Sequence, residues 1–186
     1  MTGAYTTFAN NGYYTRPIYI TRIEDKNGVE IYTSEKKDRQ ALEEEPNYVM
    51  VEMLKYAGSG NMSGIKSEIG GKTGTTNDYV DGWFMGITPS LVVGTWVGGE
   101  DRWIRFLTLR DGAGSRMAKP FCKEFISRLE KDENCDYNYK ARFQRPKGDL
   151  SIGLDCNDFL NNDLEEEDED LIMPTDSTFY EDPFGG

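Results

Sequence analysis

The residues best suited to chemistry lie in one short stretch, Lys72-Thr73-Gly74-Thr75, which follows Ile69-Gly70-Gly71. Lys72 offers an ammonium group to an anionic ligand or to a nearby hydroxyl. On an extended strand Thr73 and Thr75 are two residues apart, so their side chains share one face. Gly74 has no side chain, which allows the backbone of a peptide ligand to lie alongside as an added strand. The backbone N–H of Thr75 could then stabilise an oxyanion.

The rest of the chain offers few alternative chemistries. There is no histidine, which excludes histidine acid–base catalysis and argues against a zinc site. The three cysteines have no CxxC spacing, although a Cys135–Cys156 bridge is an option in an oxidising compartment. Gly71-Lys72-Thr73 resembles part of a phosphate loop, but the Walker pattern requires glycine where Lys66 stands. We therefore expect no metal, no cofactor and no nucleotide.

Three runs of β-branched and aromatic residues, at 69–76, 81–88 and 91–98, must position this stretch. They are separated by turn residues and predict three antiparallel strands. The second and third runs are joined at Pro89-Ser90, so we expect a tight hairpin there. Trp83 and Trp96 fall on adjacent strands, where packing against each other is favoured over a platform for stacking sugars.

Helices are predicted at residues 1–11, 46–57 and 115–130, where apolar residues recur at helical spacing. Asn11-Gly12 favours a left-handed end for the first helix. Ser115 is a candidate cap for the third. The apolar face of this third helix is expected to comprise Phe121, Cys122, Phe125, Ile126 and Leu129.

A hairpin is predicted from residues 17–24 and 29–33, which alternate between apolar and polar residues. Asn27-Gly28 favours a type I′ turn between them. Residues 34–45 are highly charged and are expected to form a loop.

The charge distribution predicts two parts. Residues 1–129 contain 16 Lys+Arg and 16 Asp+Glu, whereas residues 130–186 contain 5 and 17, and supply the whole net charge of −12. We therefore expect a neutral folded domain at 1–131 and an acidic, disordered tail at 132–186. No basic patch indicates nucleic-acid binding. No signal peptide is present at the N-terminus, and no apolar run approaches the roughly 20 residues of a membrane span.

Lys72-Thr73-Gly74 is also the third signature motif of serine penicillin-binding proteins and class A β-lactamases. The surrounding blocks resemble, more narrowly, the transpeptidase domain of bifunctional, class A penicillin-binding proteins of the penicillin-binding protein 1A type. These blocks are residues 4–12, 17–28, 71–76, 81–89 and 97–98. The resemblance implies an α+β fold with an antiparallel sheet flanked by helices, part of a penicillin-binding transpeptidase/β-lactamase-like fold.

The resemblance also implies roles for the stretch. Lys72 would face the nucleophile and support proton transfer, and the Thr75 N–H would form half of the oxyanion hole. Thr73, Gly74 and Thr75 would bind the D-alanyl-D-alanine end of a peptidoglycan stem peptide, or a β-lactam that imitates it. The reaction would be the cross-linking of stem peptides through a serine acyl-enzyme.

The family's nucleophile motifs are not expected in this chain. Ser-x-x-Lys should lie on a helix, followed by Ser-x-Asn, and both should precede Lys72. Ser34 with Lys37, and Ser63 with Lys66, have the spacing but fall in segments with no helical pattern. Ser59-Gly60-Asn61 precedes Ser63, which is the wrong order.

We therefore expect a C-terminal fragment that does not acylate by itself. The resemblance implies that its parent carries a glycosyltransferase domain and a membrane anchor upstream, at the periplasmic face of the bacterial inner membrane. Two alternatives remain open. One is a DD-carboxypeptidase or β-lactamase relative that hydrolyses the acyl-enzyme. The other is a non-catalytic, carboxylate-binding scaffold whose acidic tail contacts a partner.

Overall fold

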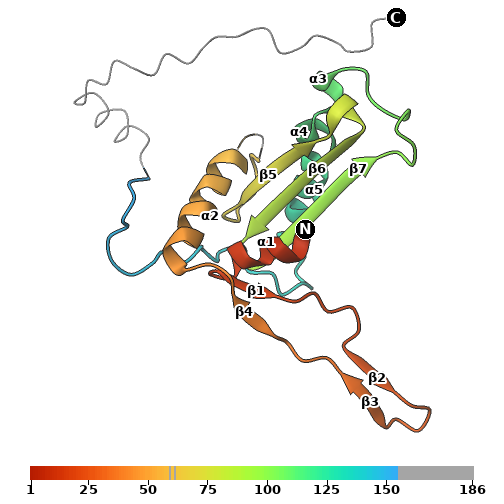
Figure 1. Cartoon of the computed structure of the whole chain (residues 1–186), viewed down its shortest axis with the longest axis vertical. Helices are drawn as coiled ribbons and strands as arrows, with labels where there is room; N and C mark the ends of the chain where they lie inside the picture. Colours follow the sequence, from red (N-terminus) through yellow and green to blue (C-terminus); the bar gives the residue numbers. More distant parts are fainter. Residues whose placement is uncertain (59, 61, 155–186) are drawn as a thin grey trace, which may run out of the picture. The chain divides into compact units, whose positions relative to one another are not determined.

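A three-stranded antiparallel sheet forms the centre of the fold (Figure 1). The computed structural model describes residues 1–58, 60 and 62–154. The strands β5 (Gly70–Thr75), β6 (Asp81–Thr88) and β7 (Leu91–Gly98) lie in the order β5-β6-β7. Thr88 pairs with Leu91, which confirms the hairpin at Pro89-Ser90. Trp83 lies opposite Trp96 with ring centroids 6.3 Å apart, so the two rings pack as predicted.

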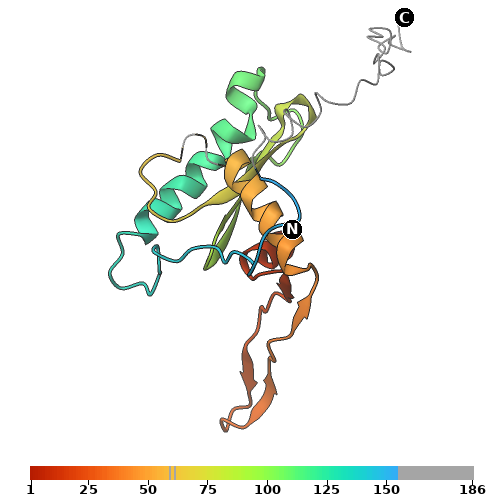
Figure 2. The same ribbon diagram turned by 90° about the vertical axis from the view of Figure 1, so that its left-hand side faces the viewer.

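Helices cover both faces of this sheet. The helices are α1 (Thr2–Ala9), α2 (Glu44–Gly58), α3 (Leu109–Gly112), α4 (Gly114–Met117) and α5 (Lys119–Leu129). In Figure 2, α2 and α5 lie on opposite sides of the strands. This arrangement is the predicted α+β fold, an antiparallel sheet flanked by helices.

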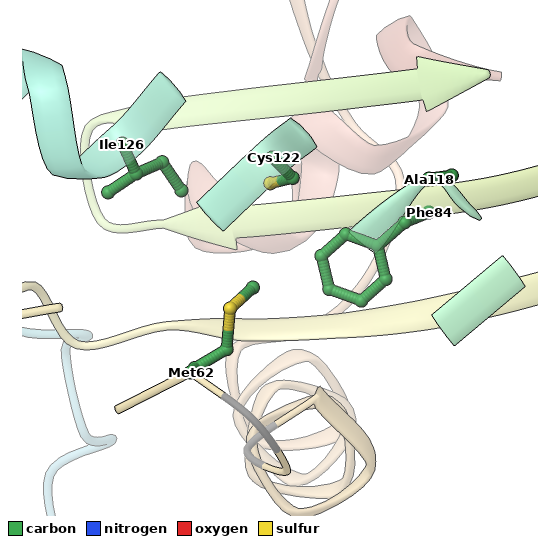
Figure 3. Close-up of a cluster of buried hydrophobic side chains, with 5 residues drawn as sticks. All are labelled: Met62, Phe84, Ala118, Cys122 and Ile126. Atoms are coloured by element: carbon green, nitrogen blue, oxygen red, sulfur yellow. The ribbon is translucent and has the colours of Figure 1, made fainter. Parts of the chain in front are cut away.

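The two faces have separate apolar clusters because successive residues of a strand point to opposite sides. On one face Phe84 of β6 packs with Met62, with Ala118 just before α5, and with Cys122 and Ile126 of α5 (Figure 3). On the other face Ile87 packs with Val51 and Leu54 of α2, and Tyr5 and Phe8 of α1 contact this cluster. The sheet is therefore the middle layer of three.

The apolar face predicted for the third helix was only partly right. Cys122 and Ile126 are fully buried, but Phe121 and Phe125 are exposed. The buried stripe instead repeats every four residues from Ala118, and these residues share one apolar cluster with Phe84. Ser115 does not cap the helix: Ala113 precedes α4 and makes no side-chain cap.

The N-terminal segment shows one confirmed and one incorrect prediction. Asn11 and Gly12 follow α1 with φ of 50° and 89°, the left-handed end that was predicted. The charged segment 34–45 is not simply a loop, because β4 (Asp38–Gln40) pairs with β1 (Tyr13–Thr15). Side-chain contact between Thr15 and Asp38 (2.6 Å) supports this long-range pairing.

A second hairpin joins β2 (Arg22–Glu24) and β3 (Glu30–Thr33), as predicted, but its turn is different. Only Gly28 has a positive φ, of 80°, whereas a type I′ turn needs two such residues. The Gly28 N–H donates to the Asp25 carbonyl at 3.1 Å, and the Asp25 N–H donates to the Val29 carbonyl at 2.9 Å. The Asp25 carboxylate accepts from Asn27 and Val29, which stabilises this three-residue loop.

The compact unit that contains the sheet runs from Met1 to Leu150, beyond the predicted boundary at residue 131. Residues 132–150 belong to it because Tyr137 donates a hydrogen bond to Thr88 and Phe143 donates its N–H to Glu68. The acidic run at 163–170 lies outside the described residues. Among the helices that are described, none is long and apolar enough to cross a membrane.

Candidate functional site

The predicted stretch Lys72–Thr75 lies on β5, at the edge of the sheet. The Thr76 N–H donates to the Asp81 carbonyl at 3.1 Å, and the Asp81 N–H donates to Thr76 Oγ1 at 2.8 Å. Thr76 and Asp81 therefore face each other as a hydrogen-bonded pair. Along an antiparallel ladder, hydrogen-bonded pairs alternate with pairs that are not hydrogen-bonded to each other. Thr75 and Thr73 lie one and three residues before Thr76, so both belong to the second kind, and their N–H and C=O groups point away from β6.

This edge is covered at its start and open further along. At Gly71, α2 ends against the strand: a Cβ on Gly58 would lie only 2.4 Å from the Gly71 nitrogen. Beyond that point no described strand pairs with the outer edge of β5. The backbone donors and acceptors of Thr73 and Thr75 therefore lie on the unpaired part of this edge.

The side chains of the stretch divide between the two faces. Thr73 pairs with Phe84 and Thr75 with Gly82, so both threonines lie on the face that carries α5. Lys72 pairs with Met85 on the opposite face. Its ammonium nevertheless returns to the open edge, where Nζ donates to the Thr73 carbonyl at 2.9 Å. The predicted pairing of Thr73 and Thr75 on one face is thus found, with the Lys72 amine beside it.

Helix α4 fixes the hydroxyl of Thr75. The Gly114 N–H donates to Thr75 Oγ1 at 2.9 Å. A side chain on Gly114 would collide with the Gly74 and Trp83 carbonyl oxygens, at 2.4 and 2.7 Å, so glycine allows this close approach. Since the Thr75 oxygen accepts from Gly114, its own O–H remains available to donate to a carboxylate.

A hydrogen-bonded brace, formed by Glu130, Ser67, Tyr137 and Thr88, holds the segment that leads into β5. The Glu130 carboxylate accepts from the Ser67 N–H at 2.8 Å, from Ser67 Oγ at 2.6 Å and from the Lys66 N–H at 3.0 Å. Tyr137 hydroxyl lies 3.0 Å from Ser67 Oγ and donates to Thr88 Oγ1 at 3.2 Å. Burial would raise the pKa of Glu130, but the hydrogen bonds from Ser67 and Lys66 outweigh it and hold that pKa below its ordinary value.

A second carboxylate acts on the same segment. Glu68 forms an ion pair with Lys55 of α2 at 2.6 Å and accepts the Phe143 N–H at 2.8 Å. Sequence reasoning missed both Glu68 and Glu130. Nothing in their local sequence separates them from other surface carboxylates, because their partners lie 63 to 75 residues away in three of these contacts.

The Ser-x-x-Lys look-alikes do not form a nucleophile pair. Neither Ser34 with Lys37 nor Ser63 with Lys66 lies on a helix. Lys66 instead lies over the ring of Tyr139, with Nζ 5.3 Å from its centroid, and Lys123 donates to Ser63 at 3.4 Å. Ser59 and Asn61 lie outside the described residues, and within the described ones no group of acidic or cysteine side chains could hold a metal ion.

Comparisons with known proteins identify the family of this chain. A family model described as the penicillin-binding protein transpeptidase domain matches residues 1–124. Penicillin-binding protein 4 of Bacillus subtilis (strain 168) is 39% identical over 102 residues, covering 53% of this chain and 16% of that protein. Penicillin-binding protein 1A of Aquifex aeolicus (strain VF5) is 28% identical over 167 residues, covering 86% and 22%.

Solved structures show the same fold. Penicillin-binding protein 1A from Haemophilus influenzae superposes with a TM-score of 0.61 at 24% identity, covering 71% of this chain and 26% of that one. PonA1 from Mycobacterium tuberculosis gives a TM-score of 0.57 at 24% identity, covering 68% and 36%. The chain spans 16% and 22% of the two curated relatives described above. Because the family model matches 124 of the 186 residues, the chain belongs to the penicillin-binding protein transpeptidase domain family, with relatives of the penicillin-binding protein 1A type.

Proposed function

We propose that this chain supplies the substrate-binding strand of a peptidoglycan DD-transpeptidase that works through a serine acyl-enzyme. The observation that carries the proposal is the open edge of β5, where the outward backbone groups of Thr73 and Thr75 stand beside the Lys72 ammonium. Membership of the transpeptidase family supports the same reaction.

Each residue of the stretch then has a distinct task. The hydroxyls of Thr73 and Thr75 bind the terminal carboxylate of a D-alanyl-D-alanine stem peptide or of a β-lactam. Gly74 leaves room for the ligand backbone, and the Thr75 N–H donates to the oxyanion. Lys72 supplies positive charge at the carboxylate and supports proton transfer at the nucleophile.

The reaction is a double displacement. A serine hydroxyl attacks the carbonyl between the two D-alanines, the C–N bond breaks, and the departing D-alanine amine takes up the proton. The amine of a second stem peptide then attacks the ester, releasing the serine and forming the cross-link. No Ser-x-x-Lys motif lies on a helix among the described residues, so in this proposal the serine comes from another part of the parent protein.

The setting follows from the same proposal. The parent is a bifunctional, membrane-anchored protein whose transpeptidase domain acts at the extracytoplasmic face of the inner membrane. Residues 1–150 provide the domain's C-terminal portion, and an acidic tail follows them. A parent sequence with no Ser-x-x-Lys motif would instead favour the alternative of a non-catalytic, carboxylate-binding scaffold.

The test is a titration of the isotopically labelled chain with an acylated peptide ending in D-alanyl-D-alanine, followed by amide NMR. We expect shifts at Thr73, Thr75 and their neighbours, and weaker binding by Thr73→Val and Thr75→Val. Thr21→Val, a change at an exposed threonine outside the site, is the matched control. A peptide ending in a carboxamide should bind poorly. Equal affinity for the acid and the amide would refute the proposed carboxylate site.

A further inference from the structure

The loop between β7 and α3, residues 99–108, carries an exposed apolar surface, and we term it the Trp103 loop (Figure 1). Its exposed apolar side chains are those of Trp103, Ile104, Phe106 and Leu107. The Ile104 N–H donates to the Asp101 carbonyl at 3.0 Å. This hydrogen bond closes a turn that has Trp103 at its tip, which explains why this side chain is 77% exposed.

Contacts with the turn after β5 fix the place of the Trp103 loop. The Asp78 carboxylate pairs with Arg102 at 3.6 Å, and the Asp78 carbonyl accepts from Arg105 at 3.4 Å. The Phe106 N–H donates to the Tyr79 carbonyl at 3.4 Å. Asp78 and Tyr79 have φ of 61° and 58°, a left-handed conformation that few residues other than glycine adopt. The exposed indole is therefore held beside the end of the strand that carries the candidate site.

A hollow of about 410 Å³ beyond the C-terminal end of β5 adjoins the Trp103 loop. It is lined by residues 75–79 together with Arg105 and Leu109. The next step rests on the proposed function, which places the peptide's terminal carboxylate at Thr73 and Thr75 and its reacting carbonyl at the Thr75 N–H. The residues before the terminal dipeptide then run past Thr75 and across this hollow, at about 3.3 Å per residue. In peptidoglycan the other end of a stem peptide is attached to a sugar of the glycan strand, so this sugar arrives at the Trp103 loop.

The chemistry of the Trp103 loop suits an uncharged sugar. Residues 100–111 contain three arginines and three carboxylates, so they have no net attraction for an anionic membrane or a nucleic acid. These groups offer both hydrogen-bond donors and acceptors to hydroxyl and amide groups. Trp83 and Trp96 pack against each other, whereas no ring among the described residues packs against Trp103. The face of this indole is therefore open to an apolar face of a ligand.

We propose that the Trp103 loop binds the glycan strand to which the stem peptide is attached, with the Trp103 indole stacked on the C–H face of a sugar ring. Tryptophan suits this role because it combines a large, flat apolar area with a polar N–H at its edge. The arginines and carboxylates beside it hydrogen-bond the hydroxyl and amide groups of the sugar. The preferred substrate is therefore a stem peptide that carries its sugar rather than the free peptide.

The test compares two ligands that end in D-alanyl-D-alanine: an acylated stem peptide, and the same peptide attached to an N-acetylated disaccharide of the glycan strand. We expect the full-length chain to bind the glycopeptide roughly 5-fold more tightly, which is the size of one stacking contact. The disaccharide should also shift the amide NMR signals of residues 101–107. Trp103→Ala should abolish the gain in affinity and leave binding of the free peptide unchanged, and Trp103→Phe should keep part of the gain.

The control is Tyr19→Ala, which removes a more exposed aromatic side chain from the segment before β2. This variant should keep the gain from the disaccharide. Persistence of the gain in both Trp103→Ala and the Trp103→Ala/Leu107→Ala double variant would overturn the proposal. Binding to phosphatidylglycerol vesicles that depends on Trp103, without any gain from the disaccharide, would overturn it in favour of a membrane contact. Equal binding of the two ligands by the unmodified chain would overturn this inference alone, whereas no binding of either would overturn the proposed function as well.

Discussion

Removing the Glu130 carboxylate should loosen the segment that carries Lys72. Glu130→Ala leaves two groups of the nearly buried Ser67 without their acceptor, its N–H and its hydroxyl. The Lys66 N–H is exposed and can bind water instead. Hydrogen bonds to charged groups contribute about 1.5–3 kcal/mol each, and Tyr137 still contacts the Ser67 hydroxyl, so we expect a loss of about 2–3 kcal/mol.

Two variants calibrate this value. Glu130→Gln keeps an acceptor oxygen and removes the charge, so it should cost about 1 kcal/mol. Glu124→Ala removes a carboxylate of the same helix whose partner, Arg128, is exposed, and should change stability by no more than about 0.5 kcal/mol. The comparison isolates the brace from a general loss of negative charge on α5.

The assay is urea unfolding followed by the fluorescence of Trp83, Trp96 and Trp103, combined with hydrogen exchange of the β5 amides. We expect Glu130→Ala to lower the free energy of unfolding in urea by about 2–3 kcal/mol and to speed exchange in β5 before it affects β7. The effect should depend on pH. The folded-state pKa of Glu130 is depressed, so its contribution is present above the ordinary value of 4.5 and is lost as the pH falls below it. If Glu130→Ala were no less stable than Glu124→Ala near neutral pH, the brace would have no energetic role.

Three further predictions concern packing. Gly71→Ala would place a Cβ 2.5 Å from the Phe84 ring and 2.6 Å from the Met85 carbonyl oxygen, so it should prevent folding, as seen by a loss of near-ultraviolet circular dichroism; a native-like spectrum would contradict this. Burial raises the pKa of the Cys122 thiol to about 12, so in the folded chain iodoacetamide should label exposed Cys135 and spare Cys122. Equal labelling of the two cysteines, measured by mass spectrometry, would show that the core is open. Apolar side chains exposed on α2 and α5, among them Tyr56 and Phe121, predict marginal stability or aggregation of the isolated chain, which a sharp, reversible thermal transition of a monomer would refute.

The sequence alone predicted the features that depend on residues close together in the chain. The β6–β7 hairpin follows from alternating residues and the Pro89-Ser90 turn, and the end of α1 follows from Asn11-Gly12. The candidate site was predicted to the same extent, because the placement of Thr73 and Thr75 on one face needs only the period of a strand.

Tertiary structure decided the features that depend on distant residues. The pairing of β4 with β1 and the contacts of Glu130 and Glu68 join segments that lie far apart in the chain. A charged side chain carries no local signal of which backbone N–H it will meet. The prediction of a type I′ turn at Asn27-Gly28 was wrong because the Asp25 carboxylate accepts hydrogen bonds from Asn27 and Val29, which favours a different loop.

The open edge of β5 shows both contributions. Sequence identified Lys72, Thr73 and Thr75 as a strand that could bind a peptide. Only the fold settled that β5 is the outermost strand of its sheet, that Gly114 orients the Thr75 hydroxyl, and that Arg105 lines the hollow at the strand's end. Side-chain periodicity is a local property of a strand, whereas the position of a strand in its sheet and the loops beside it are set by the packing of the whole domain.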